Sequence, residues 1–399
     1  MPFDVARVRG LFPALGDGWV HLDAQAGMQV PDQVATAVAT AMRAPVSGPG
    51  GTFPSSQRGT AIVDAARRAV ADLLGCDPAG VVLGPSTAVL LRSFADAVSQ
   101  GWLLGDEVVA SRLDEPTNTA PWLRGAHRSG ATVRWAEVDI ETCELPAWQY
   151  DELVSRRTRL VAVTAASRAV GTRPEIARIA EHTRDAEALL VVDATGAAPF
   201  VPLDIEALGA DVIAVCATAW GGPTVGALAF RDPRLLDRLP SAALELDAAG
   251  PERLELGPHG YSMLAGLVAS VDYLADLDDA AVGSRRERLT TSLGSVKSYQ
   301  AGLMSHLVAE LRGLRDVMVI GDAMRRVPVT AFTVAGMKAD DVVDELAAAG
   351  VCAFADSGRH DLLAALGVGE VGGAVRVGLA HYTTAGEVDQ LVRAVAALP

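Results

Sequence analysis

Short apolar segments alternate with helical patterns between residues 60 and 230, and this alternation restricts the fold more than any other feature of the chain. The apolar segments are short and rich in β-branched residues, which is typical of strands buried on both faces of a mainly parallel sheet. Predicted strands lie at 81–83, 107–110, 132–135, 160–163, 189–192 and 212–215, and helical patterns at 60–74, 86–99, 118–128 and 173–184. The pattern predicts a doubly wound α/β domain with its ligand site at the carboxyl ends of the strands.

The last third of the chain has a different pattern of smaller elements. Long helices are predicted at 261–277 and 287–314, and short strands and helices follow them up to residue 397. This order is typical of an α+β domain. A chain of 399 residues is long enough for two domains. We expect an N-terminal segment (1–20) that packs on the small domain, a large α/β domain (21–255) and a small C-terminal α+β domain (256–399), with the linker near 242–256.

Charge and hydropathy exclude two classes of partner. The formal net charge is −15, and a nucleic-acid-binding protein would instead carry a basic surface. The mean hydropathy is +0.25, and the uncharged run 212–230 is long enough for a membrane helix. Gly221-Gly222-Pro223 interrupts that run, so it is predicted to form strand, loop and strand. Since no signal-peptide pattern begins the chain, we expect a cytoplasmic protein without nucleic-acid or membrane partners.

Side chains with special chemistry are few. The four cysteines lie far apart without metal-ligand spacing, so we expect no metal site and no disulfide framework. Only Lys297 and Lys338 are lysines among the 34 basic residues. Composition bias explains the excess of arginine, but any reaction that requires a lysine must use one of these two.

Several motifs then resemble one family. They include a buried strand that ends in Asp193, and a second strand that leads into Cys216-Ala-Thr-Ala-Trp-Gly-Gly-Pro223. Further matching stretches are Leu113–Trp122, Leu160–Ser167, Leu203–Asp211, Leu254–Gly257 and Val375–Tyr382. In this order and spacing the chain resembles the class V aminotransferases, a group of pyridoxal-phosphate enzymes, and especially their cysteine-desulfurase-like branch. The resemblance covers essentially the whole chain.

The resemblance implies roles for several residues. Asp193 would pair with the pyridinium nitrogen of the cofactor and keep it protonated. Ser86 and Thr87, at the start of a helix, would hold the phosphate, with an ordinary helix N-cap as the alternative. Arg376 would take a substrate carboxylate by bidentate hydrogen bonds, with a structural ion pair as the alternative. Cys216 and Thr218 would lie beside the cofactor.

The chain departs from the family pattern at the positions that carry the chemistry. Ala219 stands where the resemblance places the lysine that forms a Schiff base with the cofactor, and Glu115 stands at the histidine that stacks on the ring. Glu115 could act as a general base or could be an ordinary solvated acid. Arg168 occupies the place of an asparagine, and we include it among the substrate-binding candidates. The remaining departures are Gly196, Pro258 and a loop at 355–360 that has no nucleophilic cysteine.

Joint loss of these groups predicts a protein that has lost covalent pyridoxal-phosphate catalysis. We expect no covalently bound cofactor, although pyridoxal phosphate or another small phosphate or carboxylate ligand could bind non-covalently. The chain would be a homodimer that acts as a ligand binder or partner protein. One alternative is an active enzyme of this fold, such as an aminotransferase, a C–S lyase or an epimerase, that works without an imine-forming lysine. Another is a subunit that completes the site of an active paralogue.

Overall fold

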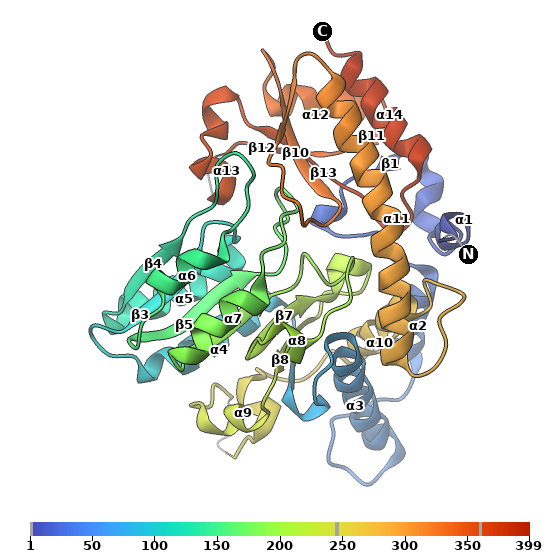
Figure 1. The fold of residues 1–399 in the computed structure, drawn as a ribbon. Coiled ribbons are helices and arrows are strands. Elements are labelled where there is room, and N and C mark those ends of the chain that lie inside the picture. Colours follow the sequence, from blue (N-terminus) through green and yellow to red (C-terminus); the bar gives the residue numbers. More distant parts are fainter. Residues whose placement is uncertain (1–2, 244–246, 359–360) are drawn as a thin grey trace.

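A mixed seven-stranded sheet forms the centre of the larger part of the molecule (Figure 1). The computed structural model describes residues 3–243, 247–358 and 361–399. The strand order in the sheet is β2-β8-β7-β6-β5-β3-β4, and only β8 runs antiparallel to its neighbours. The strands are β2 (Val81–Gly84), β3 (Glu107–Ser111), β4 (Thr132–Ala136), β5 (Thr158–Thr164), β6 (Leu189–Asp193), β7 (Val212–Cys216) and β8 (Gly226–Phe230). This confirms the predicted α/β class with a mainly parallel sheet.

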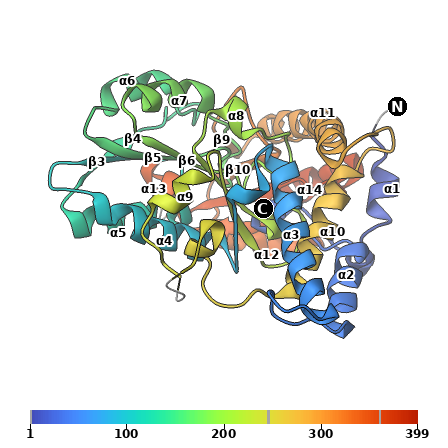
Figure 2. The ribbon, with the colours of Figure 1, turned by 90° about the horizontal axis from the view of Figure 1, so that it is seen from below.

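Helices cover both faces of this sheet, as the continuous apolar strands require. Figure 2 shows α4 (Thr87–Val98), α5 (Pro116–Ser129) and α9 (Arg234–Arg238) on one face, with α6 (Tyr150–Leu153), α7 (Ile176–Asp185) and α8 (Ile205–Leu208) on the other. Two further helices, α2 (Asp32–Arg43) and α3 (Pro54–Leu74), pack against α10 (Tyr261–Ala275). The run 212–230 forms β7, the 3-10 helix η6 (Ala217–Trp220) and β8, as predicted.

A smaller antiparallel sheet forms the second part, in the order β12-β13-β10-β9. Its strands are β9 (Val317–Ile320), β10 (Val329–Val334), β12 (Phe354–Asp356) and β13 (Ala374–Gly378). The helices of this part are α11 (Arg285–Gly313), α12 (Ala339–Ala348), α13 (Asp361–Ala365) and α14 (Ala385–Ala396). The predicted second domain is therefore α+β. Its boundary at residue 256 stays a prediction, since α10 lies on α2 and α3.

The N-terminal segment lies against the C-terminal elements. Its short helix α1 (Val5–Arg9) contributes Arg9, whose Nη1 donates to the carbonyl of Tyr382 at 2.7 Å and to Glu387 Oε1 at 2.8 Å. The strand β1 (Val20–His21) pairs in parallel with β11 (Val351–Cys352). The beginning and the end of the described chain thus hold each other in place.

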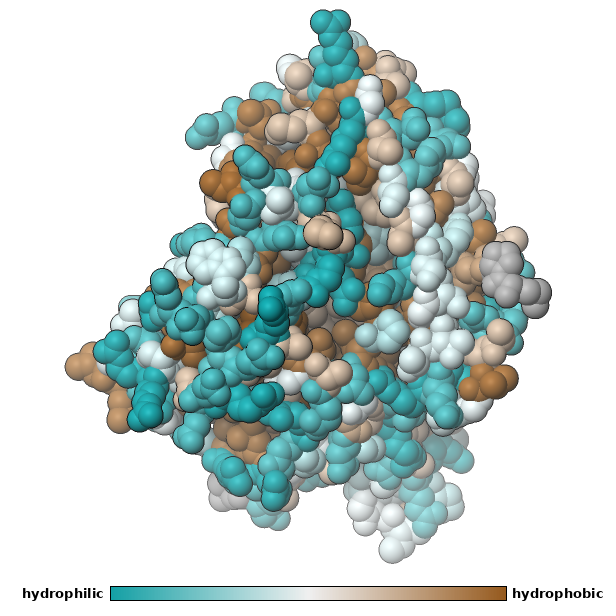
Figure 3. Space-filling model, viewed as in Figure 1, coloured by the Kyte–Doolittle hydropathy of each residue, from teal (hydrophilic) through white to brown (hydrophobic). Residues whose placement is uncertain are grey.

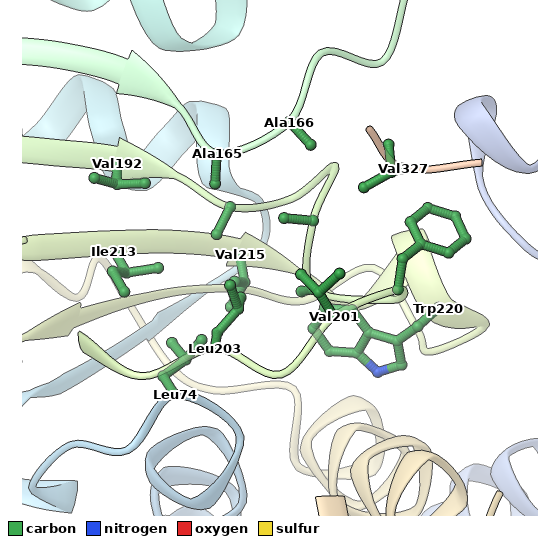
Figure 4. Close-up of a cluster of buried hydrophobic side chains, with 14 of the residues drawn as sticks. Leu74, Ala165, Ala166, Val192, Val201, Leu203, Ile213, Val215, Trp220 and Val327 are labelled. Atoms are coloured by element: carbon green, nitrogen blue, oxygen red, sulfur yellow. The ribbon is translucent and has the colours of Figure 1, made fainter. Parts of the chain in front are cut away.

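One continuous hydrophobic core joins the two sheets. Figure 4 shows Val192, Ile213 and Val215 on adjacent strands of the large sheet, beside Val201 and Trp220. Val327, two residues before the small-sheet strand β10, belongs to the same buried cluster. The two parts are therefore packed together across their boundary. Among the described residues, no helix is long and apolar enough to cross a membrane.

Candidate functional site

A cavity of about 170 Å³ lies at the carboxyl ends of β6 and β7. Parallel strands end at the same edge of a sheet, which brings the residues that follow them close together. Eight of the nine candidate site residues line this cavity, all but Arg376: Ser86, Thr87, Glu115, Arg168, Asp193, Cys216, Thr218 and Ala219. Gly196, one of the departures from the family pattern, lines it as well. The 3-10 helix η2 (Ala24–Ala26) and Val329 of the small sheet complete the wall.

Asp193 is the last residue of β6, and its carboxylate is held by the turn that follows. Its Oδ1 accepts a hydrogen bond from the backbone N–H of Thr195 at 2.9 Å. Burial raises the pKa of Asp193, while the hydrogen bond from the backbone N–H of Thr195 and the charge of Arg168 oppose this shift. The carboxyl group is therefore poised to face a cationic or proton-donating atom of a ligand, which would compensate its lost hydration.

The amino end of α4 supplies the opposite side of the cavity. Ser86 is the N-cap, and its Oγ accepts from the backbone N–H of Val89 at 3.3 Å. A Cβ on Gly226 would lie 2.4 Å from the backbone nitrogen of Thr87, so only glycine allows β8 to pass this close to the turn. The N-cap alternative for Ser86 is what the structure shows. The helix amino terminus still faces the cavity and favours an anion there.

The segment after β7 carries no amine. Ala219 lies in η6 and lines the cavity, beside Cys216 and Thr218, whose Sγ and Oγ1 atoms are 3.2 Å apart. A Cβ on Gly27 would lie 3.2 Å from the carbonyl oxygen of Thr218, so η2 closes tightly over this turn. Among the residues that the structure describes, no lysine lines this cavity.

An ion pair between Arg168 and Glu115 occupies one side of the cavity. The Nη1 atom of Arg168 lies 3.2 Å from Glu115 Oε2, and its Nε donates to the carbonyl of Gln25 at 2.8 Å. A Cβ on Gly196 would lie 2.5 Å from the carbonyl oxygen of Ala166 and 3.0 Å from Arg168 Cγ, so the backbone at Ala166 and the arginine side chain both require glycine here. Arg168, Glu115 and Gly196 therefore form one connected arrangement on this side of the cavity.

Arg376 and the two lysines lie outside this cavity. The Nε atom of Arg376 on β13 is 3.4 Å from Asp356 Oδ2, so the structure shows the ion-pair alternative, and a carboxylate-binding role stays a prediction. Lys297 on α11 lines a different cavity, and Lys338 is the N-cap of α12. Residues 359–360 of the predicted cysteine-free loop lie outside the described residues.

Sequence reasoning missed several residues of the cavity wall. Thr195 lines it, and the Oγ1 of Thr195 is buried without a hydrogen-bond partner among the described residues. The sequence did contain a signal for Thr195, because its hydroxyl follows the strand-terminal acid Asp193 by two residues. Gln25 and Phe200 also line the cavity, but nothing in their local sequence distinguishes them from ordinary loop residues.

The cavity combines a strand-terminal acid with a helix amino terminus, and the small antiparallel sheet packs beside it. The family model for aminotransferase class V matches residues 20–391. The chain belongs to this family.

Individual relatives cover the chain almost completely. An uncharacterized protein of Mycobacterium tuberculosis, MT3887, is 53% identical over 398 residues, which is 100% of both chains. The cysteine desulfurase CsdA of Escherichia coli is 29% identical over 412 residues, covering 98% of this chain and 97% of its own. A crystal structure of that enzyme matches with a TM-score of 0.84 at 26% identity, over 99% of this chain and 98% of the other. The chain therefore shares the fold of the cysteine desulfurases.

Pyridoxal phosphate is the cofactor that this family implies, and the cavity fits part of it. Asp193, the unpartnered Oγ1 of Thr195 and the amino end of α4 offer a carboxylate, a hydroxyl and backbone N–H groups to a ring nitrogen and a phosphate. When bound, the protonated ring would act as an electron sink. Covalent attachment does not fit, because Ala219 offers no amine.

Proposed function

We propose that this chain holds a phosphate-bearing ligand non-covalently and has lost covalent pyridoxal-phosphate catalysis. The observation that carries the proposal is Ala219 in a cavity whose described lining contains no lysine. The Arg168–Glu115 pair supports it, because two charged groups line the cavity at positions where the resemblance implies an asparagine and a ring-stacking histidine. The cavity volume of about 170 Å³ is below the range of about 300–1,000 Å³ for pockets that enclose drug-sized ligands. The ligand is therefore small.

Borohydride trapping tests the loss of covalent attachment. Wild-type protein and the Ala219→Lys variant are each reduced in the presence of one equivalent of pyridoxal phosphate, and adducts are mapped by mass spectrometry. We expect a stoichiometric adduct at position 219 of the variant and none in the wild type. A stoichiometric wild-type adduct at Lys297 or Lys338 would refute the proposal.

Three related probes test the mode of ligand binding. Pyridoxine phosphate has no aldehyde, pyridoxal has no phosphate, and pyridoxal phosphate has both. If binding is non-covalent and directed by the phosphate, the two phosphorylated compounds bind within about threefold of each other and pyridoxal binds at least tenfold more weakly. Asp193→Asn is expected to weaken both phosphorylated probes. Turnover of an amino acid, abolished by Asp193→Asn, would favour the alternative of an active enzyme without the lysine.

We further propose a homodimer. Exposed apolar side chains lie close together in sequence around the loop between α2 and α3, where Met42 is 70% and Phe53 is 53% exposed. Association with a second copy would bury these two side chains. Sedimentation at several concentrations is expected to give a dimer for the wild type and a weakened dimer for Phe53→Asp. A monomer at all concentrations would contradict this.

A further inference from the structure

A second and larger cavity, of about 610 Å³, lies between the two parts of the molecule. One wall is a face of α11, and the other is formed by the segment 322–328 together with Arg173, Phe200 and Val201. Figure 3 shows a hollow beside the pale surface of α11, bordered by strongly hydrophilic side chains. Its volume falls within the range of small-molecule sites.

Backbone hydrogen bonds across the domain boundary hold this cavity in shape. The N–H of Arg173 donates to the carbonyl of Arg325 at 2.9 Å, and the N–H of Val327 donates to the carbonyl of Gly171 at 2.8 Å. Gly171 has a φ of +81°, and a Cβ there would lie 2.4 Å from the carbonyl oxygen of Val329. The two loops thus form a short antiparallel connection, and the cavity requires little ordering before it could bind a ligand.

Positive charge is concentrated around this cavity, although the chain as a whole carries −15. The basic residues of its described lining are Arg173, Lys297, Arg312, Arg325 and Arg326, and its one acidic residue is Asp322. Asp322 Oδ1 lies 2.8 Å from Arg312, and Glu175, outside the cavity, lies 2.9 Å from Arg325. Three basic residues therefore remain without an ion pair to a described carboxylate.

Two of those three are half-buried arginines, each with one unused hydrogen-bond donor. The Nε atoms of Arg173 and Arg326 have no hydrogen-bond partner among the described residues. Arg326 donates from Nη2 to the carbonyl of Val329 at 3.0 Å, and no described carboxylate lies within ion-pair distance of it, although the charge of Asp322 acts on it from farther away. Burial lowers the pKa of both side chains, and the charge of Arg325 adds to the effect at Arg173. A bound anion would relieve the repulsion among these positive charges and would accept hydrogen bonds from the guanidinium groups.

Apolar side chains form the rest of the cavity. Phe200, Val201, Met304, Val308 and Val327 line it, and Phe200 also lines the smaller cavity on its other side. A ligand that matches both features has an apolar or aromatic body and more than one negative charge. Inorganic phosphate alone would leave the apolar wall uncovered.

We propose that the cavity between α11 and the segment 322–328 is a second ligand site, which binds a small polyanionic compound with an aromatic or apolar body through Arg173, Lys297 and Arg326. This site is separate from the proposed phosphate site beside Ala219, so either proposal can fail without the other. Phosphate and carboxylate groups share the required chemistry, and the probes below distinguish them.

Four naphthalene probes and one ion define the required chemistry in the full-length protein. They are 1-naphthyl phosphate, naphthalene-2,6-dicarboxylate, 1-naphthoate, 1-naphthol and inorganic phosphate, titrated calorimetrically at fixed ionic strength. We expect at least tenfold tighter binding of 1-naphthyl phosphate or of the dicarboxylate than of the monoanion, the alcohol or the free ion. Preference between the first two identifies phosphate or carboxylate as the favoured group. Absence of any such preference overturns the proposal.

Three variants locate the binding. Arg173→Gln and Lys297→Gln each remove one charge from the cavity, and Arg315→Gln removes one from an exposed position outside its described lining. We expect at least a tenfold loss of affinity for the first two and less than a twofold change for Arg315→Gln. An equal loss in all three would show a general charge effect and would overturn the site. A loss with Asp193→Asn instead would place the probe in the smaller cavity and would also overturn it.

Stability measurements separate ligand binding from a structural role. Arg173 has no described ion-pair partner, and its positive neighbour Arg325 repels it. We therefore expect Arg173→Gln to unfold at a temperature no lower than the wild type while losing the probe. Lys297 is exposed on α11, so Lys297→Gln keeps the test valid if the first variant does not fold.

Discussion

His381 is a buried histidine that is neutral in the folded protein. It is fully buried, its Nε2–H donates to the carbonyl of Pro199 at 2.6 Å, and its Nδ1 accepts from the hydroxyl of Tyr273 at 2.9 Å. Burial lowers the pKa of His381 from 6.5 to about 4, against a smaller opposing effect of the hydrogen bond to Pro199. The fold therefore binds this proton less readily than the unfolded chain does.

The expected consequence is a loss of stability in mild acid. The contribution of His381 is complete above pH 6.5 and declines as the pH falls toward 4, because the unfolded chain takes up the proton first. Between pH 7.5 and 5, the wild type should lose about 2 kcal/mol more than His381→Gln in the free energy of unfolding. Urea titrations at both pH values measure it. Equal losses in the two proteins would contradict the assignment.

Asp114 has the opposite pH dependence. Its side chain is buried beside Asn118, its Oδ2 has no partner among the described residues, and burial raises its pKa from 3.8 to about 7. The folded state keeps the proton that the unfolded chain releases above pH 4, so this group loses stabilisation as the pH rises toward 7.

Asp114→Asn mimics the protonated carboxyl group and should remove this dependence. Between pH 5 and 8 the wild type is expected to lose about 2 to 3 kcal/mol relative to the variant in the free energy of unfolding. Between pH 4 and 6.5 the effects of His381 and Asp114 on the free energy of unfolding partly cancel in the wild type. Each single variant therefore reveals the effect of the residue that remains. An unchanged pH profile in Asp114→Asn would show that Asp114 is ionised in the fold.

Glycines provide the clearest predictions at the scale of whole elements. Gly302 is exposed in the interior of α11, and a Cβ there would meet no atom within 4 Å. Gly302→Ala is expected to raise the free energy of unfolding by about 0.5 to 1 kcal/mol, because alanine restricts the unfolded chain and favours the helix. Thermal unfolding measures this change, and a destabilised variant would indicate that α11 meets another chain there.

Gly171 is the matched contrast. Its positive φ and the carbonyl of Val329, which would lie 2.4 Å from a Cβ, leave no space for a side chain. Gly171→Ala should lower the free energy of unfolding by more than about 1 kcal/mol, with the damage concentrated at the connection between the two parts. If Gly171→Ala and Gly302→Ala behaved alike, the close approach at Gly171 would be refuted.

The sequence predicted elements better than contacts between them. Continuous apolar runs such as 189–192 and 212–215 specify buried strands, and the strand-terminal position of Asp193 follows from them. The contact between Arg168 and Glu115 joins residues that are 53 positions apart through two loops, and no local pattern encodes it. The ion pair of Arg376 with Asp356 likewise depends on pairing within the small sheet.

At the scale of the molecule, hydrogen bonds connect the N-terminal segment to the C-terminal elements. Arg9 donates to both the Tyr382 carbonyl and the Glu387 carboxylate in a partly buried position. Arg9→Ala should lower the free energy of unfolding by about 2 kcal/mol, since charge-assisted hydrogen bonds are lost. Arg234→Ala, which removes an exposed ion pair with Asp232, should leave the free energy of unfolding nearly unchanged, because solvent screens that pair. Similar effects in both variants would argue against a tie at Arg9.

The domain arrangement follows from the order of elements, but the cavities follow from packing. Strands and helices after residue 260 predicted an α+β part, while the second cavity needs Arg173, Phe200 and the face of α11 to meet across the boundary. Such a meeting depends on how the two sheets share one core, and a single sequence carries no local signal of it.

Phe200 has a consequence for how the two cavities would behave together, because its ring is one wall of both. A shift of Phe200 caused by a ligand in one cavity would therefore alter the wall of the other cavity. A ligand bound in one cavity would then change the affinity of the other cavity for its ligand through Phe200, without contact between the two ligands. Thermodynamic reciprocity requires that the change each causes in the affinity of the other be the same factor, so a titration of either one measures both.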